Sequence, residues 1–208
     1  MTPNITCSDV LETINRRIVE LRNQAISGCG VRNEVIAFEK WMRERYFSDE
    51  CSPIRDVIEP FRFRCALKAS CSFLRNWKTY ESERDIVDDW PYGWLRFESS
   101  PTRTDEIVMR WKLAGGLFVG EDRKMMAKRD SPAWSKFSLF GLPYPPFDQY
   151  FDIALASVEA DEARSLGLRG QVSAPPSLTE PAALTIDSDV VTLITNANRN
   201  AYPRVSQF

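Results

Sequence analysis

Two pairs of aspartates have the residue types needed for acid–base or metal chemistry. Asp88 and Asp89 are adjacent, and Asp148 and Asp152 are four residues apart. Paired carboxylates can act as general acid and general base, or can bind a divalent cation such as magnesium. Each pair can equally be a helix cap, a turn or a solvated charge, and no third carboxylate follows at a telling spacing. A carboxylate-dependent metal nuclease is therefore one alternative, but the sequence predicts no catalytic residue, no metal site and no cofactor.

The chain contains no histidine among its 208 residues. Histidine is the usual general base near neutral pH and the commonest metal ligand. Its absence excludes Ser-His-Asp and Cys-His nucleophiles, Cys2His2 zinc sites and haem ligation through histidine. What remains open is carboxylate chemistry, lysine chemistry or no chemistry at all.

The cysteines do not have the spacing of a structural zinc site, whose ligands come in pairs two to four residues apart. The closest pair, Cys65 and Cys71, is six positions apart and diverges on a helix. We expect reduced thiols that behave as small buried hydrophobic side chains. The five are Cys7, Cys29, Cys51, Cys65 and Cys71.

One predicted helix carries a basic face. Four cations fall within a narrow stripe at about 100° per residue: Arg64, Lys68, Arg75 and Lys78. No acidic residue occurs between Glu59 and Glu81. Such a face could contact nucleic-acid phosphates with a salt-dependent affinity; the alternative is a solvated face whose cations pair with acids elsewhere. Because the net charge is −2, any DNA contact must come from this local patch.

The first third of the chain has the apolar periodicity of helices. We expect helices at about 9–27, about 35–46, antiparallel to the first, and about 53–81. Asp9 and Glu12 have the spacing of a capping box for the first of them.

The following segment mixes strands and helices. Residues 94–98 alternate as a short strand does, and a helix from Thr104 ends at Gly115-Gly116. The runs around 117–119 and 125–127 predict a hairpin. Gly120 and the paired glycines could suggest a phosphate-binding loop, but no Gly-Lys-Ser/Thr follows, so a helix stop and a turn are favoured.

A segment rich in proline and aromatic residues comes next. Asp130 or Ser131 is predicted to cap a short helix with Pro132 at its first position. The Tyr-Pro-Pro-Phe stretch could be a polyproline ligand, but nearby aromatic residues favour a loop packed on its own domain. A last helix is expected at about 158–166. The structural motif residues of this region are Asp130, Pro132, Trp134, Tyr144, Pro145, Pro146 and Gly167.

In this order, the segments from residue 61 to residue 168 resemble the minor head protein family of tailed bacteriophages, the phage Mu F-like or head-morphogenesis family. The family pattern has a helix ending in tryptophan (here 69–77), an aromatic strand (here 90–97), a Pro-x-Trp step and a Tyr-Pro-Pro loop. It closes with Glu-Ala-x-x-Leu-Gly-Leu, here 162–168. The chain departs from many relatives in lacking histidine and in having 147–152 where they carry a cysteine-containing segment.

The resemblance implies a non-enzymatic structural protein of a phage or prophage, acting in the virion or the host cytoplasm. It implies contacts with portal or capsid protein and, through the basic face, with DNA. No apolar run approaches the roughly 20 residues of a membrane span, so no membrane partner is expected. Besides the nuclease, a small cytosolic bacterial binding module of the immunity type remains an alternative.

These patterns predict an α+β fold. It would consist of an N-terminal helical segment at 1–82, a small mixed α/β core at 83–169, and an extended or flexible C-terminal tail at 170–208. The tail is predicted from its polar composition, rich in Pro, Ser, Thr and Asn.

Overall fold

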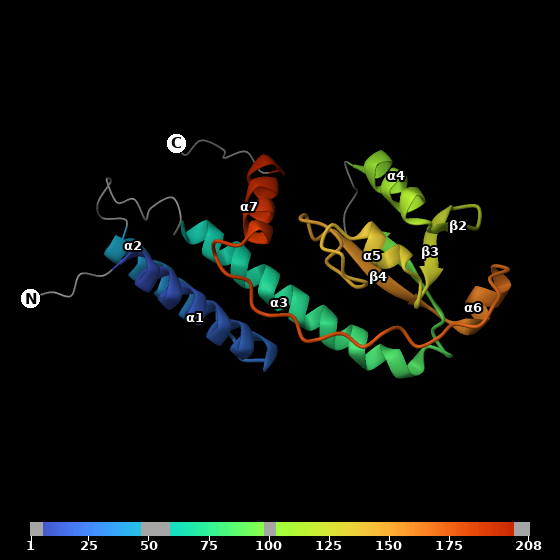
Figure 1. Ribbon diagram of the computed structural model, residues 1–208, viewed down its shortest axis with the longest axis horizontal. Helices are drawn as coiled ribbons and strands as arrows, with labels where there is room; N and C mark the ends of the chain where they lie inside the picture. Colours follow the sequence, from blue (N-terminus) through green and yellow to red (C-terminus); the bar gives the residue numbers. More distant parts are fainter. Residues whose placement is uncertain (1–5, 47–58, 98–102, 202–208) are drawn as a thin grey trace, which may run out of the picture. The chain divides into compact units, whose positions relative to one another are not determined.

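The structure, a computed structural model, describes residues 6–46, 59–97 and 103–201 (Figure 1). Within these ranges the fold is α+β as predicted, with N-terminal helices and a four-stranded antiparallel sheet. The helices are α1 (Cys7–Ile26), α2 (Arg32–Tyr46), α3 (Pro60–Glu83), a 3-10 turn (Arg84–Ile86), α4 (Thr104–Ala114), α5 (Ala133–Phe137), α6 (Ala160–Ser165) and α7 (Asp189–Ala201). The strands are β1 (Tyr92–Phe97), β2 (Leu117–Val119), β3 (Lys124–Lys128) and β4 (Ile153–Val158). The part of the predicted third helix before residue 59 lies outside the described residues.

The described residues form two compact units. Unit 1 contains the residues up to Arg75 together with those from Pro181 onward, and unit 2 is Asn76–Glu180. The division falls inside α3. It differs from the predicted ranges 1–82, 83–169 and 170–208 because the last part of the chain belongs to the same unit as the N-terminal helices.

Helix α1 begins earlier than predicted because Thr6 is its N-cap. The backbone N–H of Asp9 donates to Thr6 Oγ1 (3.3 Å), and the backbone N–H of Thr6 donates to Asp9 Oδ2 (2.9 Å). This reciprocal pair is a capping box. The predicted box of Asp9 and Glu12 is therefore wrong, since Asp9 is the second member of the box. The predicted apolar stripe is confirmed by the burial of Val10, Ile14, Ile18 and Leu21.

The segment before α7 is held to α1 and α3 by hydrogen bonds to its backbone. Leu184 N donates to Ser70 Oγ (2.8 Å), and Ile186 N donates to Asn15 Oδ1 (2.9 Å). The guanidinium of Arg62 donates to the carbonyl of Ile186 (3.0 Å). An extended segment cannot form regular hydrogen bonds within itself, so side chains of the neighbouring helices bind its backbone N–H and C=O groups.

The predicted tail is extended at 170–188, but residues 189–201 form α7. The apolar residues Val191 and Ile194 are three positions apart and fully buried in unit 1. Their spacing is that of an apolar helix face, but the polar composition of the surrounding residues predicted an extended tail instead.

The sheet of unit 2 has the strand order β2-β3-β1-β4. The strand at Tyr92–Phe97 and the hairpin of β2 and β3 confirm the predicted strands. Strand β4 was not predicted, and the expected helix at 158–166 is shortened to α6. The stretch Ile-Ala-Leu-Ala-Ser-Val alternates mainly in side-chain size, which is a weak strand signal.

A buried aromatic cluster on one face of the sheet holds the proline-rich loop. The ring centroid of Trp134 lies 5.0 Å from that of Trp111 and 5.9 Å from that of Phe147. Tyr144, Phe147 and Trp134 are almost fully buried. The loop containing Pro145-Pro146, which is a cis peptide, is thus packed on its own unit, as favoured from the sequence.

Of the two residues expected to cap α5, Asp130 and Ser131, only Ser131 binds the first turn of the helix. Ser131 Oγ accepts the first amide of the helix (3.2 Å), while Asp130 instead accepts from the backbone N–H of Ser173 (2.9 Å). Pro132 stands at the N-cap rather than at the first helical position. Gly167 follows α6 with a φ of 75°, as expected of a helix stop.

Glu81 binds the extended C-terminal segment within unit 2. Its carboxylate accepts from the backbone N–H of Leu178 (2.8 Å) and from the hydroxyl of Ser177 (3.0 Å). The bond from Leu178 is the main reason why the pKa of Glu81 is lowered. The indole N–H of Trp77 donates to the carbonyl of Leu178 (2.9 Å), so the same residue is bound from two sides.

We expect Glu81→Ala to accelerate hydrogen exchange at the Leu178 amide by about tenfold or more, because a hydrogen bond to a charged acceptor contributes about 1.5–3 kcal/mol. Exchange monitored by NMR would measure this. Asp85→Ala is the matched control, since Asp85 is an exposed carboxylate nearby in sequence. Equal exchange rates in the two variants would contradict the role assigned to Glu81.

Candidate anion-binding site

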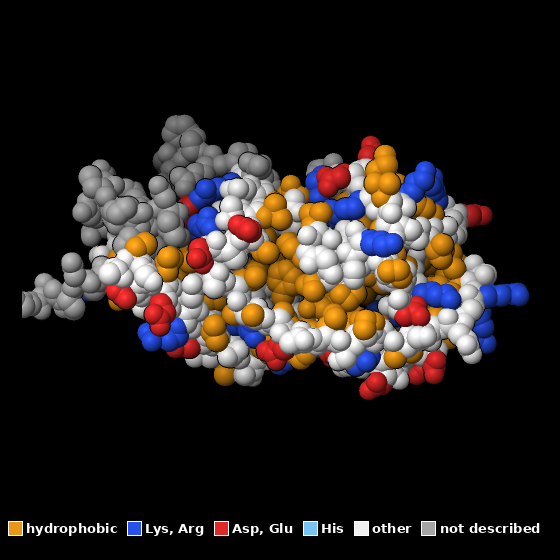
Figure 2. All heavy atoms as spheres, in the orientation of Figure 1, with side chains coloured by type: hydrophobic (Ala, Val, Ile, Leu, Met, Phe, Trp, Pro, Cys, Tyr) orange, Lys and Arg blue, Asp and Glu red, His pale blue; other side chains and the backbone are white. Residues whose placement is uncertain are grey.

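The basic face predicted on α3 is exposed. Arg64, Lys68, Arg75 and Lys78 are all solvent-accessible, with the first three in unit 1 and Lys78 in unit 2. Both signs of charge occur over the visible surface (Figure 2), in keeping with the net charge of −2. Any electropositive site is therefore local.

Arg64 forms a bidentate ion pair with Glu39 of α2. Its Nε donates to Oε1 and its Nη2 donates to Oε2. The side chain of Glu39 is only 6% exposed, whereas that of Arg64 is 59% exposed. The hydrogen bonds to Glu39 raise the pKa of Arg64. One cation of the stripe is thus paired with an acid outside its helix, while the rest of its side chain faces solvent.

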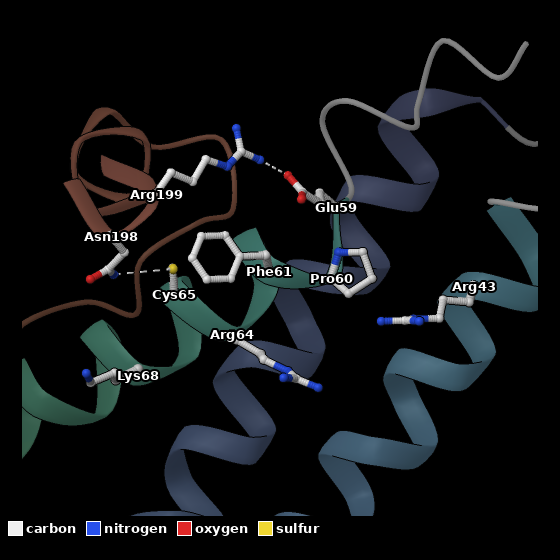
Figure 3. A pocket seen from close by; sticks show the side chains of 9 residues that line it. All are labelled: Arg43, Glu59, Pro60, Phe61, Arg64, Cys65, Lys68, Asn198 and Arg199. Carbon is white, nitrogen blue, oxygen red and sulfur yellow. Dashed lines mark hydrogen bonds and ion pairs between the residues drawn. The ribbon is translucent and has the colours of Figure 1, made fainter. Parts of the chain in front are cut away.

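Arg64 and Lys68 line a pocket of about 560 Å³ (Figure 3). Arg43 of α2 and Arg199 of α7 bring two further cations to its wall, and the only carboxylate in the lining is that of Glu59. Figure 3 shows Arg43 and Arg64 pointing toward each other from α2 and α3. The complete lining is Arg43, Glu59, Pro60, Phe61, Arg64, Cys65, Lys68, Asn198 and Arg199.

Arg199 is held in place on two sides. It forms an ion pair with Glu59, and its guanidinium carbon lies 5.9 Å from the ring centroid of Phe61. These contacts fix a cation from α7 above the beginning of α3. With Glu59 in the lining and Glu39 bound to Arg64 both counted, the cations outnumber the carboxylates by four to two. Such a wall attracts anions, above all phosphates, whose oxygens match the planar fork of arginine.

Cys65 offers the pocket no nucleophile. Asn198 Nδ2 lies 3.9 Å from its Sγ, and burial raises the pKa of the thiol. Since the thiolate is the reactive form, Cys65 is expected to be inert at neutral pH. The lining therefore supports binding rather than covalent chemistry.

The other cysteines only partly follow the prediction that all five are buried. Cys7 and Cys29 are exposed, because they lie at the start of α1 and beyond its end. Cys71 is half-buried on α3, and burial raises the pKa of its thiol. Cys51 lies outside the described residues.

The structure brings Asp148 and Asp152 together, but around arginines. Asp148 is 1% exposed and lies 3.3 Å from Nη2 of Arg103 and 3.4 Å from Nη2 of Arg110. Asp152 lies 3.3 Å from the same nitrogen of Arg103. The guanidinium of Arg103 also lies over the ring of Tyr150, 3.6 Å from its centroid. These carboxylates balance partly buried arginines, whereas the nuclease alternative would need them to bind a metal ion.

The first aspartate pair lies in the turn before β1. Asp88 and Asp89 are both exposed, and the carbonyl of Asp89 accepts from the backbone N–H of Ala160 (3.0 Å). Within residues 6–46, 59–97 and 103–201, no three Cys, Asp or Glu residues are grouped so that they could hold a metal ion.

The glycine pair after α4 is a helix stop. Gly115 is the C-cap with a φ of 85°, and Gly120 has a φ of 73° in the turn between β2 and β3. The helix stop and hairpin predicted there are confirmed. Among the described helices, none is both long and apolar enough to cross a membrane.

Sequence patterns identified Arg64 and Lys68 but not the rest of the pocket. Arg43 lies in the last turn of α2 among alternating charges, and Asn198 and Arg199 lie in the predicted tail. The helical spacing of residues 191–198 was the one available signal. The chain matches no known family model, and no similar curated protein or solved structure was found.

Proposed function

We propose that this chain is a non-catalytic structural protein of a tailed-phage or prophage head whose basic pocket binds phosphate groups of DNA. The observation that carries the DNA contact is the pocket lining of four cations and one carboxylate. The assignment to a phage head, and with it a portal or capsid protein as partner, rests on the order of sequence motifs between residues 61 and 168.

The pocket has the size and the donors for part of a nucleic-acid strand. Its volume of about 560 Å³ exceeds that of a single phosphate and suits a nucleotide unit. Because Glu39 uses Nε and Nη2 of Arg64, Nη1 is the remaining nitrogen that can face a ligand. Contacts of this kind position a phosphate backbone without reading its sequence.

The test uses a variant that removes two cations without disturbing Glu39. Arg43→Ala with Lys68→Ala is expected to weaken binding of duplex DNA about tenfold at low salt. It should also reduce the slope of log affinity against log salt by about two, since each phosphate contact contributes about 0.9. Fluorescence anisotropy at a series of salt concentrations would measure both quantities.

Arg16→Ala with Lys40→Ala is the matched control. It makes the same change in net charge at exposed cations of α1 and α2 that do not line the pocket. Equal losses in the two double variants would mean that only overall charge matters, and would contradict binding in the pocket.

Copurification from lysates that contain assembled heads tests the phage assignment separately. We expect portal or capsid protein as the main partner. A main partner that is not a virion protein would contradict this assignment and support the small cytosolic binding module instead.

A further inference from the structure

The lining of the basic pocket has an apolar part as well as a cationic part. Four of the lining residues come from one face of α3, within about 100° of its circumference: Phe61, Arg64, Cys65 and Lys68. Phe61 and Cys65 form one edge of this face, while Arg64 and Lys68 form the other. A free cysteine behaves as a small hydrophobic side chain. An apolar surface and a row of cations therefore adjoin along a single helix.

Phe61 stands apart from the aromatic contacts within unit 1. Phe38 and Phe63, for example, have ring centroids 5.1 Å apart. Among the described residues no aromatic ring makes such a contact with Phe61, which is half-buried and lines the pocket. Figure 3 shows its side chain directed from the beginning of α3 toward Cys65 and Asn198. An aromatic ring in a basic pocket is a surface on which a nucleic-acid base can stack.

Asn198 adds a polar group from α7. Its side-chain nitrogen lies 3.9 Å from Sγ of Cys65, and sulfur is only a weak acceptor of hydrogen bonds. A side-chain amide has two donor hydrogens and an acceptor oxygen, so it can also pair with the edge of a base. The wall thus combines cations for phosphate, a ring for stacking and an amide for a base edge.

We propose that the pocket binds one unpaired nucleotide of a single strand, with its base on Phe61 and its phosphates on the neighbouring cations. This inference rests on the proposed binding of DNA phosphates and specifies the form of the ligand. A base in a duplex is stacked and paired, so it can reach a pocket wall only after it is flipped out of the helix. A single strand avoids that cost, and every base has a face that can stack.

The distribution of the cations favours a strand over a free nucleotide. The guanidinium carbon of Arg199, on α7, lies 5.9 Å from the centre of the Phe61 ring. Arg43 and Arg64 reach the pocket from α2 and α3 (Figure 3). A nucleotide within a strand has a phosphate on each side of its sugar, whereas a nucleoside monophosphate has one. Cations from three helices therefore match the charge of a strand better.

Phe61→Leu tests the stacking, because it keeps an apolar side chain and all four cations. We expect the wild-type protein to bind a single strand of about ten nucleotides about tenfold more tightly than a duplex of the same sequence. The variant should bind the single strand about tenfold more weakly and the duplex almost unchanged, since one base–aromatic stack is lost. The salt dependence of binding should not change, because no cation is removed. Fluorescence anisotropy would measure these affinities.

Trp41→Leu is the matched control, since Trp41 is an exposed aromatic residue of unit 1 that does not line the pocket. It should leave both affinities unchanged. Phe61→Tyr, which keeps the ring, should bind like the wild-type protein and so separates stacking from a general loss of structure. The inference would be overturned if Phe61→Leu weakened single-strand and duplex binding equally, or if Trp41→Leu had the same effect as Phe61→Leu.

Competition distinguishes the sources of such a nucleotide. Adenosine monophosphate should displace the labelled strand at least about tenfold less effectively than an unlabelled strand, and inorganic phosphate should be weaker still. Adenosine monophosphate as effective as the strand would overturn the strand as ligand, and phosphate as effective as the nucleotide would overturn the base contact. If Arg43→Ala with Lys68→Ala weakens neither single-strand nor duplex binding, the proposed function itself fails. If that variant weakens duplex binding but the wild-type protein shows no preference for the single strand, only this inference fails.

Discussion

Asp148→Ala is expected to lower the free energy of unfolding of unit 2 by about 2–3 kcal/mol, because it removes a buried carboxylate that accepts hydrogen bonds from two arginines. Among the described carboxylates, the arginines then keep only their more exposed partners, Asp152 and Glu106. The side chains of Arg103 and Arg110 are only 17% and 15% exposed, and both approach Asp148. Arg110 is expected to lose most, since its Nε has no hydrogen-bond partner and its Nη1 keeps only the ion pair with Glu106 (3.7 Å), whose side chain is 58% exposed. Urea unfolding followed by tryptophan fluorescence would measure the loss.

Asp152→Ala is the control for this prediction. Asp152 is 22% exposed and contacts Arg103, which keeps Asp148 as a partner in the variant. We expect a loss of about 1 kcal/mol or less, as for other partly exposed ion pairs. Similar losses for the two variants would contradict the central role of Asp148. Magnesium-dependent DNA cleavage that disappears in Asp148→Ala without loss of stability would support the nuclease alternative.

Gly116→Ala is expected to destabilise unit 2 by about 3 kcal/mol or more, which is the upper range for overpacking of a core. A Cβ at this position would overlap the indole ring of Trp111. That ring cannot move away easily, because it is fully buried and its Nε1 donates to the carbonyl of Leu117 (2.9 Å). Thermal and urea unfolding of the variant would quantify the effect.

Gly115→Ala separates this clash from the conformational preference of glycine. Its φ of 85° disfavours alanine, but a Cβ there meets nothing within 4 Å. The expected cost is about 1–2 kcal/mol, that of one left-handed residue. If Gly116→Ala costs no more than Gly115→Ala, the contact with Trp111 does not limit the choice of residue at position 116.

Local sequence patterns were sufficient to predict those elements whose formation depends mainly on their own residues. The apolar stripe of α1, the left-handed glycine after α4 and the hairpin of β2 and β3 all follow from spacing and turn residues. They were insufficient for elements that form only by packing against residues far away in the chain. Strand β4 pairs with β1 from about 60 residues earlier in the chain, and α7 is stabilised by residues of the N-terminal helices. No local pattern shows either partner.

The candidate site shows the same limit. The exposure of Arg64 and Lys68 followed from their spacing on one helix, but the pairing of Arg64 with Glu39 did not. Arg43 and Arg199 reach the pocket from α2 and α7, which come together only in the folded unit. Likewise, Asp148 and Asp152 were singled out as carboxylates, and their arginine partners lie 38 to 49 residues earlier.

The interrupted course of unit 1 along the chain has a consequence for synthesis on the ribosome. Unit 2 is continuous and can fold as soon as it emerges, whereas unit 1 is completed only by residues from Pro181 onward. At a translation rate of about 5–20 residues per second, the roughly 100 intervening residues keep α1 and α2 without their final partner for about 5–20 s. During that interval the apolar stripe of α1 is incompletely covered. The nascent N-terminal helices are thus the part of this protein where chaperone binding is expected.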